Sequence, residues 1–487
     1  MFMTLLFLRV YMESWEVVVI GGNPAALRAA IAAADGGAST ILIDSAGIGS
    51  RQGNPSLSGL AASVGEIDSS AHREDTIFVG GEKTNKISAA RVCGQAVSIV
   101  AELERWGLVF RRDEEGLPYR SNAPGHSKAR LTGCGEATVR EITRVLEEQT
   151  IKRKITRKYD CQALSIVSDN HQVSGLTYLD IISGEVHSIQ AKSIILATEG
   201  YEGLWQSPAE GSGTGLALAI KSHISLNGMN NFPTHPLTIK GTNMHIPIDI
   251  LDSGGQIRKP NGDNAQPSDV IEENCVLDLR KINQEEKVWY NNTLLNIKNR
   301  TNLDIKNDVI PISSSIVTTG GIPVDSEGRV TLNEGELWFT GLYAAGQSSN
   351  NGMHGSGLLP GNMLLNGLFS GQIAGSSASS WAIKENFSNS SLVKLEEQKS
   401  LNKINKIHNS KGKTVGQIST TLKSLSNHLF NEPEQTSSIS KSLEELQKNG
   451  FRLTDTSKAM NTELLTAIQI YHLILILEKI LLEEKEG

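Results

Sequence analysis

The stretch VVVIGGNPAALRAAIAAADGGASTILID, Val17 to Asp44, decides the fold that this sequence predicts. Its first apolar residues, 17–20, predict a buried strand, and the alanine-rich residues 25–34 predict a helix that ends at a glycine pair. A second apolar strand follows over residues 41–43. Strand, tight turn, helix and strand in this order are typical of a dinucleotide-binding unit.

The turn of this unit has an unusual composition. In such turns the first glycine makes the bend, the second lets a pyrophosphate approach the backbone, and the third lets the helix pack on the strand. Those places hold Gly21, Asn23 and Ala26. Asn tolerates turn conformations, and Pro24 suits a first helical position, so we predict that the helix forms. It should offer a phosphate one donor fewer, and a side chain should stand where the ligand would lie. Asp44 follows at the spacing of an acid that binds ribose hydroxyls.

The composition of the whole chain is that of an ordinary globular protein. Its 487 residues are enough for two or three domains, with 39% hydrophobic and 20% charged residues. A net charge of -7 leaves no large basic face, so we expect no nucleic-acid partner. The four cysteines lie far apart without C-x-x-C spacing, so we expect no metal site, no disulfide framework and a reducing, cytoplasmic location.

Both ends of the chain carry apolar stretches. The opening MFMTLLFLRV is too short to span a bilayer and lacks the order of a signal peptide, and we expect translation to begin at Met12. The closing stretch LLTAIQIYHLILILEKILLEEKEG is interrupted by Gln, Tyr, His and Glu. We therefore interpret it as a core-packed helix and expect no direct membrane insertion.

Shifts in composition predict a nucleotide-binding domain in two pieces with another domain inserted between them. After an expected hairpin and the apolar strand in SIILATEG, residues from about 230 turn rich in Asn, Asp, Pro and Lys, and LWFTGLYAAGQ then returns to a buried strand. The predicted segments are the two nucleotide-binding pieces, the insert, a polar linker and a helical C-terminal domain: 12–229 and 329–385, 230–328, 386–415, and 416–487.

Several motifs occur in a fixed order along residues 17–375. They are GLAASVGEIDSSAHREDTIFVGGEKTN, IVAELERWGLVF, GHSKARLTGCGEATVREI, IILATEGY, GSGTGLALAI, THPL, TTGGIPVDSEGRV and GLYAAGQSSNNGMHGSGLLPGNMLLNGLFSGQIAG. As an ordered set they closely resemble the flavoprotein family of L-aspartate oxidase and the succinate dehydrogenase and fumarate reductase flavoprotein subunits. The resemblance implies a doubly wound α/β FAD-binding domain with an inserted α+β capping domain.

The resemblance also implies FAD as cofactor and names the residues that would bind it. The adenosine half would lie over the turn, and the isoalloxazine near SLSGLAAS and the loop after Gly346. Gln347 stands where family members carry an acid that binds the polyol chain. Gln52 stands where some members attach the flavin to a histidine, so we expect non-covalent FAD. The implied cofactor residues are Gly21, Gly22, Asn23, Ala26, Asp44, Ser58, Gly59, Ala61, Thr198, Gly200, Gln347, Asn362 and Leu364.

The implied substrate pocket departs much further from the family. Members clamp a dicarboxylate with two arginines and two histidines. His235 keeps one of those places, while the other three hold Leu251, Ile316 and Leu358. The place of an acid that meets the substrate amine in aspartate oxidases holds Ala123.

Three residues remain candidates for catalysis: His235, His354 and Arg130. Arg258 and Lys259 could supply charge from new directions, but we favour solvated loop cations.

The expected function is hydride transfer between flavin N5 and a small organic substrate that is less charged than a dicarboxylate. An L-aspartate oxidase or fumarate reductase proper, with charges from unusual positions, is one alternative. A non-catalytic family member kept as a partner subunit is another. An electron-transfer partner subunit is compatible with the main expectation.

Overall fold

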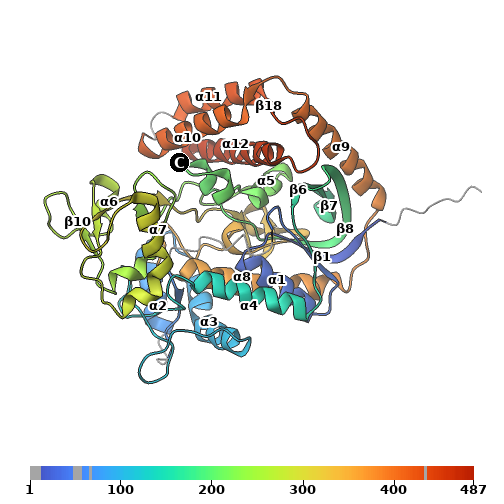
Figure 1. Cartoon of the computed structure of the whole chain (residues 1–487). Coiled ribbons are helices and arrows are strands. Elements are labelled where there is room, and N and C mark those ends of the chain that lie inside the picture. Colours follow the sequence, from blue (N-terminus) through green and yellow to red (C-terminus); the bar gives the residue numbers. More distant parts are fainter. Residues whose placement is uncertain (1–11, 48–57, 65–68, 433–435, 487) are drawn as a thin grey trace, which may run out of the picture.

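The structure is a computed structural model that describes residues 12–47, 58–64, 69–432 and 436–486. Gln52 and the residues before Met12 lie outside these ranges, so the predictions that concern them stay predictions. Among the described residues the chain folds around a central mixed sheet, with helices on both faces and a second sheet to one side (Figure 1).

The central sheet grows from the stretch that opens the sequence. Strand β1 (Ser14–Ile20) pairs in parallel with β2 (Thr40–Ile43) on one side and with β8 (Glu185–Leu196) on the other. The predicted hairpin is present, because β6 (Cys161–Asp169) and β7 (Gln172–Asp180) pair antiparallel. The sheet is completed by β5 (Thr156–Lys158), β14 (Arg329–Leu332) and β15 (Leu337–Ala344) in the order β14-β15-β7-β8-β1-β2-β5, with β6 beside β7.

Helix α1 (Pro24–Asp35) lies under this sheet, packed along α8 (Asn362–Ala382) and beside α4 (Thr138–Lys152) (Figure 1). Two of the glycines of α8 make this contact close: a Cβ on Gly371 would lie 2.4 Å from the Ala25 carbonyl oxygen, and one on Gly375 would lie 2.2 Å from the Ala29 carbonyl oxygen. The other helices of this part are α2 (Ser69–Gly80), α3 (Lys86–Arg105) and α5 (Thr214–Lys221). The doubly wound prediction is therefore confirmed.

A separate antiparallel sheet lies within residues 230–328, where the insert is predicted. Its strands run in the order β10-β11-β12-β9 and enclose a core of their own, which includes Leu237, Ile257 and Leu277. The elements are β9 (Thr234–Ile239), β10 (Gln256–Arg258), α6 (Asp269–Glu272), β11 (Val276–Asp278), α7 (Asn291–Thr301) and β12 (Ile310–Ile316). Short strands join the parts: β3 (Leu60–Ala61) to β4 (Leu131–Thr132), and β13 (Ile322–Pro323) to β16 (Ser349–Asn350).

The predicted linker over 386–415 is wrong for most of its length. Helix α9 (Ser390–His408) occupies it and packs on β6, β7 and β8. Val393 and Ile404 are buried there, and the Ser400 hydroxyl lies 2.9 Å from that of Thr177. A stripe of so few apolar residues in a polar helix resembles a linker in composition, which explains the error.

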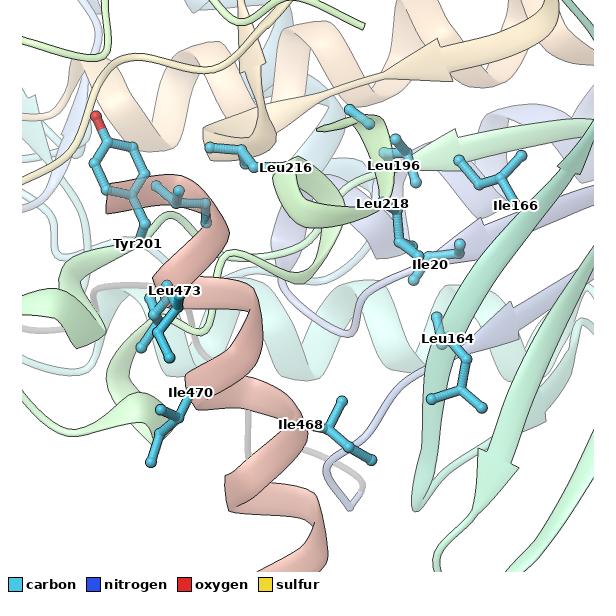
Figure 2. Close-up of a cluster of buried hydrophobic side chains, with 14 of the residues drawn as sticks. Ile20, Leu164, Ile166, Leu196, Tyr201, Leu216, Leu218, Ile468, Ile470 and Leu473 are labelled. Carbon is cyan, nitrogen blue, oxygen red and sulfur yellow. The ribbon is translucent and has the colours of Figure 1, made fainter. Parts of the chain in front are cut away.

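The remaining helices cover the other face of the sheet (Figure 1). They are α10 (Val415–Asn431), α11 (Thr436–Asn449) and α12 (Thr462–Glu486), with β17 (Lys413–Thr414) paired to β18 (Phe451–Arg452). Residues 462–483 of α12 are long and apolar enough to cross a membrane, with mean hydropathy 1.7, but 67% of that apolar window is buried inside the protein. Figure 2 shows Leu473 of α12 on the side of Tyr201 and Ile468 on the side of the strand that carries Leu164, and both belong to the same buried cluster. The C-terminal helices thus share one core with the nucleotide domain, and α12 is a core helix, as predicted.

Candidate cofactor and substrate site

The β1–α1 turn has the geometry that a dinucleotide site requires. Gly21 adopts φ +130°, and a Cβ there would lie 2.1 Å from the Ala197 carbonyl oxygen. A Cβ on Gly22 would lie 2.3 Å from an Asp44 carboxylate oxygen. The first place therefore needs glycine, and at the second a side chain would displace the Asp44 carboxylate. Asp44 lies beside the turn at the end of β2, as predicted.

Asn23 acts as the N-cap of α1. Its Oδ1 accepts hydrogen bonds from the backbone N–H groups of Ala25 (3.0 Å) and Ala26 (3.1 Å), and its Nδ2 donates to the Ala197 carbonyl at 2.9 Å. The side chain is 5% exposed. Asn23 thus starts the helix that the sequence predicts, but it does so with the N–H groups that a pyrophosphate would use.

The loop after β15 covers the start of α1. A Cβ on Gly346, at φ +63°, would lie 2.6 Å from the Ala25 side chain, and the Gly346 N–H donates to Ser370 at 2.9 Å. Next to it, Gln347 donates from Nε2 to a carboxylate oxygen of Glu202. The backbone close to the turn is thus fixed by α8 and this loop.

Glu202 is an acid that the sequence analysis missed. Its Oε1 accepts from the Thr318 N–H (2.9 Å), the Thr318 hydroxyl (2.9 Å) and Gln347. The side chain is buried, and burial raises the pKa of Glu202 to about 7 against the opposing hydrogen bonds. A signal was present: an acid shortly after a buried apolar strand, in LATEGYEG, is unusual and points to a site.

The predicted cofactor residues that follow β8 lie beside Glu202 and Gln347, whereas those around β3 lie beside β4 and Gly361. Thr198 donates from its hydroxyl to a neighbouring carbonyl and accepts from the Gly215 N–H, and a Cβ on Gly200 would lie 2.1 Å from the Thr318 hydroxyl. A Cβ on Gly59 would lie 2.7 Å from the Thr132 carbonyl oxygen, and Ala61 is buried beside it, whereas Ser58 and Leu364 are half-buried.

Asn362 has a structural task. Its Nδ2 donates to the Thr76 hydroxyl at 2.9 Å and its Oδ1 lies 2.7 Å from His72 Nε2, so it ties the start of α8 to α2.

Arg130 is buried and paired within the protein. It is 0% exposed, its Nη1 pairs with the Asp75 carboxylate, and the same nitrogen lies 2.7 Å from His126 Nδ1. The Asp75 pKa is lowered because hydrogen bonds from Ser127 and Arg130 outweigh burial. Burial and the Arg130 charge lower the pKa of His126 to about 3. Arg130 thus forms a buried ion pair, and the catalytic role predicted for it stays a prediction.

His235 is also turned inward. Its Nε2 lies 2.9 Å from the Ile246 carbonyl oxygen, and its ring stacks edge-on against His245 with centroids 5.7 Å apart. Burial, followed by the nearby His245, lowers the pKa of His235 to about 3, so the ring is neutral at physiological pH.

Two of the aliphatic residues predicted to replace the clamp lie in the insert, and the third lies on the loop before α8. Ile316 ends β12 opposite Thr234, Leu251 packs against the core of the insert, and Leu358 is half-buried. Arg258 pairs with Asp278 at 2.9 Å and Lys259 with Glu273 at 2.8 Å, so both cations are engaged within the insert.

His354 is the candidate that lines a cavity. This cavity of about 190 Å³ lies between the loop 349–355, the segment around Gly228 and the end of β12, with Lys83 at its wall. Among the described residues, the His354 Nδ1 and the Thr319 hydroxyl are buried there without a hydrogen-bond partner. Burial lowers the pKa of His354 to about 4, and Lys83 donates to Asn231 at 3.2 Å. The polar lining fits a small polar molecule.

Comparison with known proteins agrees with this geometry. The family model described as FAD binding domain matches residues 16–364. The flavoprotein subunit of 8-methylmenaquinol:fumarate reductase from Wolinella succinogenes is 25% identical over 438 residues, which are 82% of this chain and 71% of that protein. L-Aspartate oxidase from Mycobacterium leprae is 28% identical over 411 residues, 75% of this chain and 74% of that protein.

Solved structures show the same fold at lower identity. A variant of the E. coli quinol fumarate reductase subunit FrdA superposes with a TM-score of 0.86 at 21% identity and covers 96% of this chain and 89% of that one. The glycines of the turn and Asp44 fit a dinucleotide, while the first-turn donors are taken by Asn23. The chain therefore belongs to the FAD binding domain family, as an FAD-dependent oxidoreductase of the type that includes succinate dehydrogenase and fumarate reductase flavoprotein subunits and L-aspartate oxidase.

Proposed function

We propose that this oxidoreductase acts on a small organic substrate with at most one acidic group, bound in the cavity beside His354. The lining of that cavity supports this proposal. Lys83 is its one cation among the described residues, and the other side chains are neutral amides, two hydroxyls, a methionine and a neutral imidazole. A second carboxylate would be left without a partner there, at a cost of several kcal/mol.

The residues of the cavity have distinct roles in this proposal. Lys83 attracts a single carboxylate or another anionic group, and Thr319 and Asn231 orient the rest of the molecule by hydrogen bonds. The neutral ring of His354 holds a nitrogen that can accept the proton of a substrate hydroxyl or return it. FAD, when bound, supplies the hydride acceptor or donor. The turn glycines, Asp44 and Gln347 are the residues that would hold it.

The experiment is a substrate panel on purified protein reconstituted with FAD. Flavin absorbance is followed without oxygen while 2-hydroxy acids with one carboxylate, neutral alcohols and dicarboxylates are added in turn. Bleaching by a mono-acid or a neutral alcohol supports the proposal, and Lys83→Met should then raise KM for the mono-acid but leave the alcohol unchanged. Bleaching by dicarboxylates alone contradicts it. No bleaching by any of them supports the non-catalytic alternative.

The proposal also includes an electron-transfer partner subunit and a cytoplasmic location. Several of the relatives are named as flavoprotein subunits, which supports an electron-transfer partner subunit for this chain. All four cysteines are free, which fits a reducing cytoplasm. Purification of the native protein under mild conditions tests both points: a stoichiometric redox subunit in the soluble fraction is expected, and a monomer recovered from membranes would contradict them.

A further inference from the structure

The hydrogen-bond donors at the start of α1 are all accounted for within the chain. Pro24, at the first helical position, has no N–H. The next two N–H groups, of Ala25 and Ala26, both donate to Asn23 Oδ1, and that of Leu27 donates to the Asn23 carbonyl at 3.0 Å. Helix N-termini bind phosphate because such N–H groups are otherwise free. Here the first turn has none to offer while Asn23 holds its present position.

We propose that the Asn23 side chain is a built-in competitor for the FAD pyrophosphate: it occupies the phosphate-binding end of α1 in the cofactor-free protein and must swing away when FAD binds. The inference depends on FAD as the cofactor and not on the proposed substrate. It assigns to one residue both the stability of the apo turn and a reduced affinity for the cofactor.

The contacts of Asn23 explain why the competition is real. The amide is held at both ends, since Oδ1 accepts two N–H groups and Nδ2 donates to Ala197 on the neighbouring strand end. It is 5% exposed, so it cannot share these donors with a phosphate by a small shift. The neighbouring backbone cannot yield instead, because α8 contacts Ala25 directly through Gly371. The movement must therefore be a rotation of the Asn23 side chain.

The N–H groups at the start of α1 bind a phosphate more strongly when the Asn23 amide does not compete for them. Hydrogen bonds from N–H groups to a charged acceptor are shorter and stronger than those to a neutral amide oxygen, and the helix dipole adds to them. Displacement of Asn23 forfeits part of this gain. A residue without the amide gives the whole gain to FAD and leaves the apo helix without a cap.

The test compares three variants in the cofactor-free full-length protein. Asn23→Gly and Asn23→Ala both remove the amide, and either backbone is compatible with the extended conformation of residue 23. Asn389→Gly is the control, because Asn389 caps α9 in the same way, by accepting the Ser391 N–H at 2.9 Å, on a helix that is not part of the turn. FAD affinity is measured by quenching of flavin fluorescence, and apo stability by thermal unfolding.

We expect Asn23→Gly to lower the Kd for FAD about tenfold, which corresponds to about 1.4 kcal/mol. The apo melting temperature should fall by about 1 to 2 °C because a cap is lost. Asn389→Gly should lower the melting temperature alone. Asn23→Ala repeats the affinity gain if the glycine variant does not fold. Unchanged or weaker FAD binding in both Asn23 variants, or an equal gain in the control, would overturn the proposal.

Discussion

The cofactor-binding turn and the expected substrate pocket differ from the family pattern in different ways. At the β1–α1 turn, Asn23 replaces a glycine but keeps the helix start, and Gly21, Gly22 and Asp44 keep their places. At the junction with the insert, aliphatic side chains stand at three clamp places, and His235 donates or accepts only within the protein. On the proposals above, the cofactor end binds FAD more weakly than a turn with a third glycine would, whereas the substrate end no longer accepts a dicarboxylate.

The largest expected effect is on dicarboxylates and tests the substrate half of this comparison. Without arginines at the clamp, succinate, fumarate and L-aspartate lose charge-assisted hydrogen bonds worth about 1.5 to 3 kcal/mol each. We expect turnover of all three to be lower by orders of magnitude than ordinary enzyme rates of about 1 to 1000 per second. The measurement is steady-state turnover of FAD-loaded protein, with an L-aspartate oxidase as positive control. Ordinary rates on any of the three would show that the junction still binds two carboxylates.

The next largest effect is expected for Arg130, and it distinguishes a structural role of this residue from a catalytic one. Arg130→Met leaves the Asp75 carboxylate without its buried partner, and we expect the free energy of unfolding to fall by about 3 to 5 kcal/mol. Arg144→Met is the matched control: Arg144 pairs with Glu141 and Glu148 on the exposed face of α4, where a loss of less than about 1 kcal/mol is expected. Urea unfolding measures both. Normal stability with abolished turnover in Arg130→Met would support the catalytic interpretation instead.

The sequence was sufficient for the fold because its signals are local. The apolar strand, the alanine-rich helix and the acid at the end of β2 depend on near neighbours in the chain, and each lies where it was expected. Helix α9 was missed because its stability comes from Val393 and Ile404 packed on a hairpin far away in sequence.

The site was harder to predict from the sequence, because the direction of a side chain depends on contacts between residues that are distant in the chain. His235 and His354 look alike in the sequence, yet only His354 lines the cavity with an unpaired nitrogen. Glu202 meets Gln347 across 145 residues, and no local pattern gives that contact.

Glu202 offers a pH-dependent test of the cofactor half. Its folded pKa of about 7 lies above the ordinary value of 4.5, so the folded state binds more protons than the unfolded state between these values. Stability of the apo protein should therefore fall as the pH rises through this window and level off above it. One pKa unit corresponds to about 1.4 kcal/mol, so the change is on the order of 3 kcal/mol.

The measurement for Glu202 is urea unfolding of the apo protein at pH 5 and pH 8. Glu202→Gln keeps an acceptor for Thr318 and removes the charge, so it should gain stability relative to the unmodified chain at pH 8 but little at pH 5. Glu74→Gln, whose side chain is 70% exposed, is the control and should leave the profile unchanged. A Glu202→Gln profile that parallels the unmodified chain would mean that this carboxyl is not the group that titrates.

The smallest expected effect comes from the contact between α1 and α8, and it tests how rigidly α1 holds the turn. A Cβ on Gly375 would meet the Ala29 carbonyl oxygen at 2.2 Å and the Ala32 side chain at 2.8 Å, so Gly375→Ala must push the two helices apart at a cost of about 1 to 3 kcal/mol. Gly94→Ala is the matched control inside α3, where nothing lies within 4 Å of the added carbon, and it should stabilise by about 0.5 to 1 kcal/mol. Denaturant unfolding of both apo variants gives the difference, and FAD affinity of Gly375→Ala adds the functional readout. If α1 is rigid, FAD binding weakens along with stability, because the turn moves with its helix. Equal stability of the two variants would show that α1 can shift against α8, and the Asn23 side chain would then not be the only part of the turn able to make room for a phosphate.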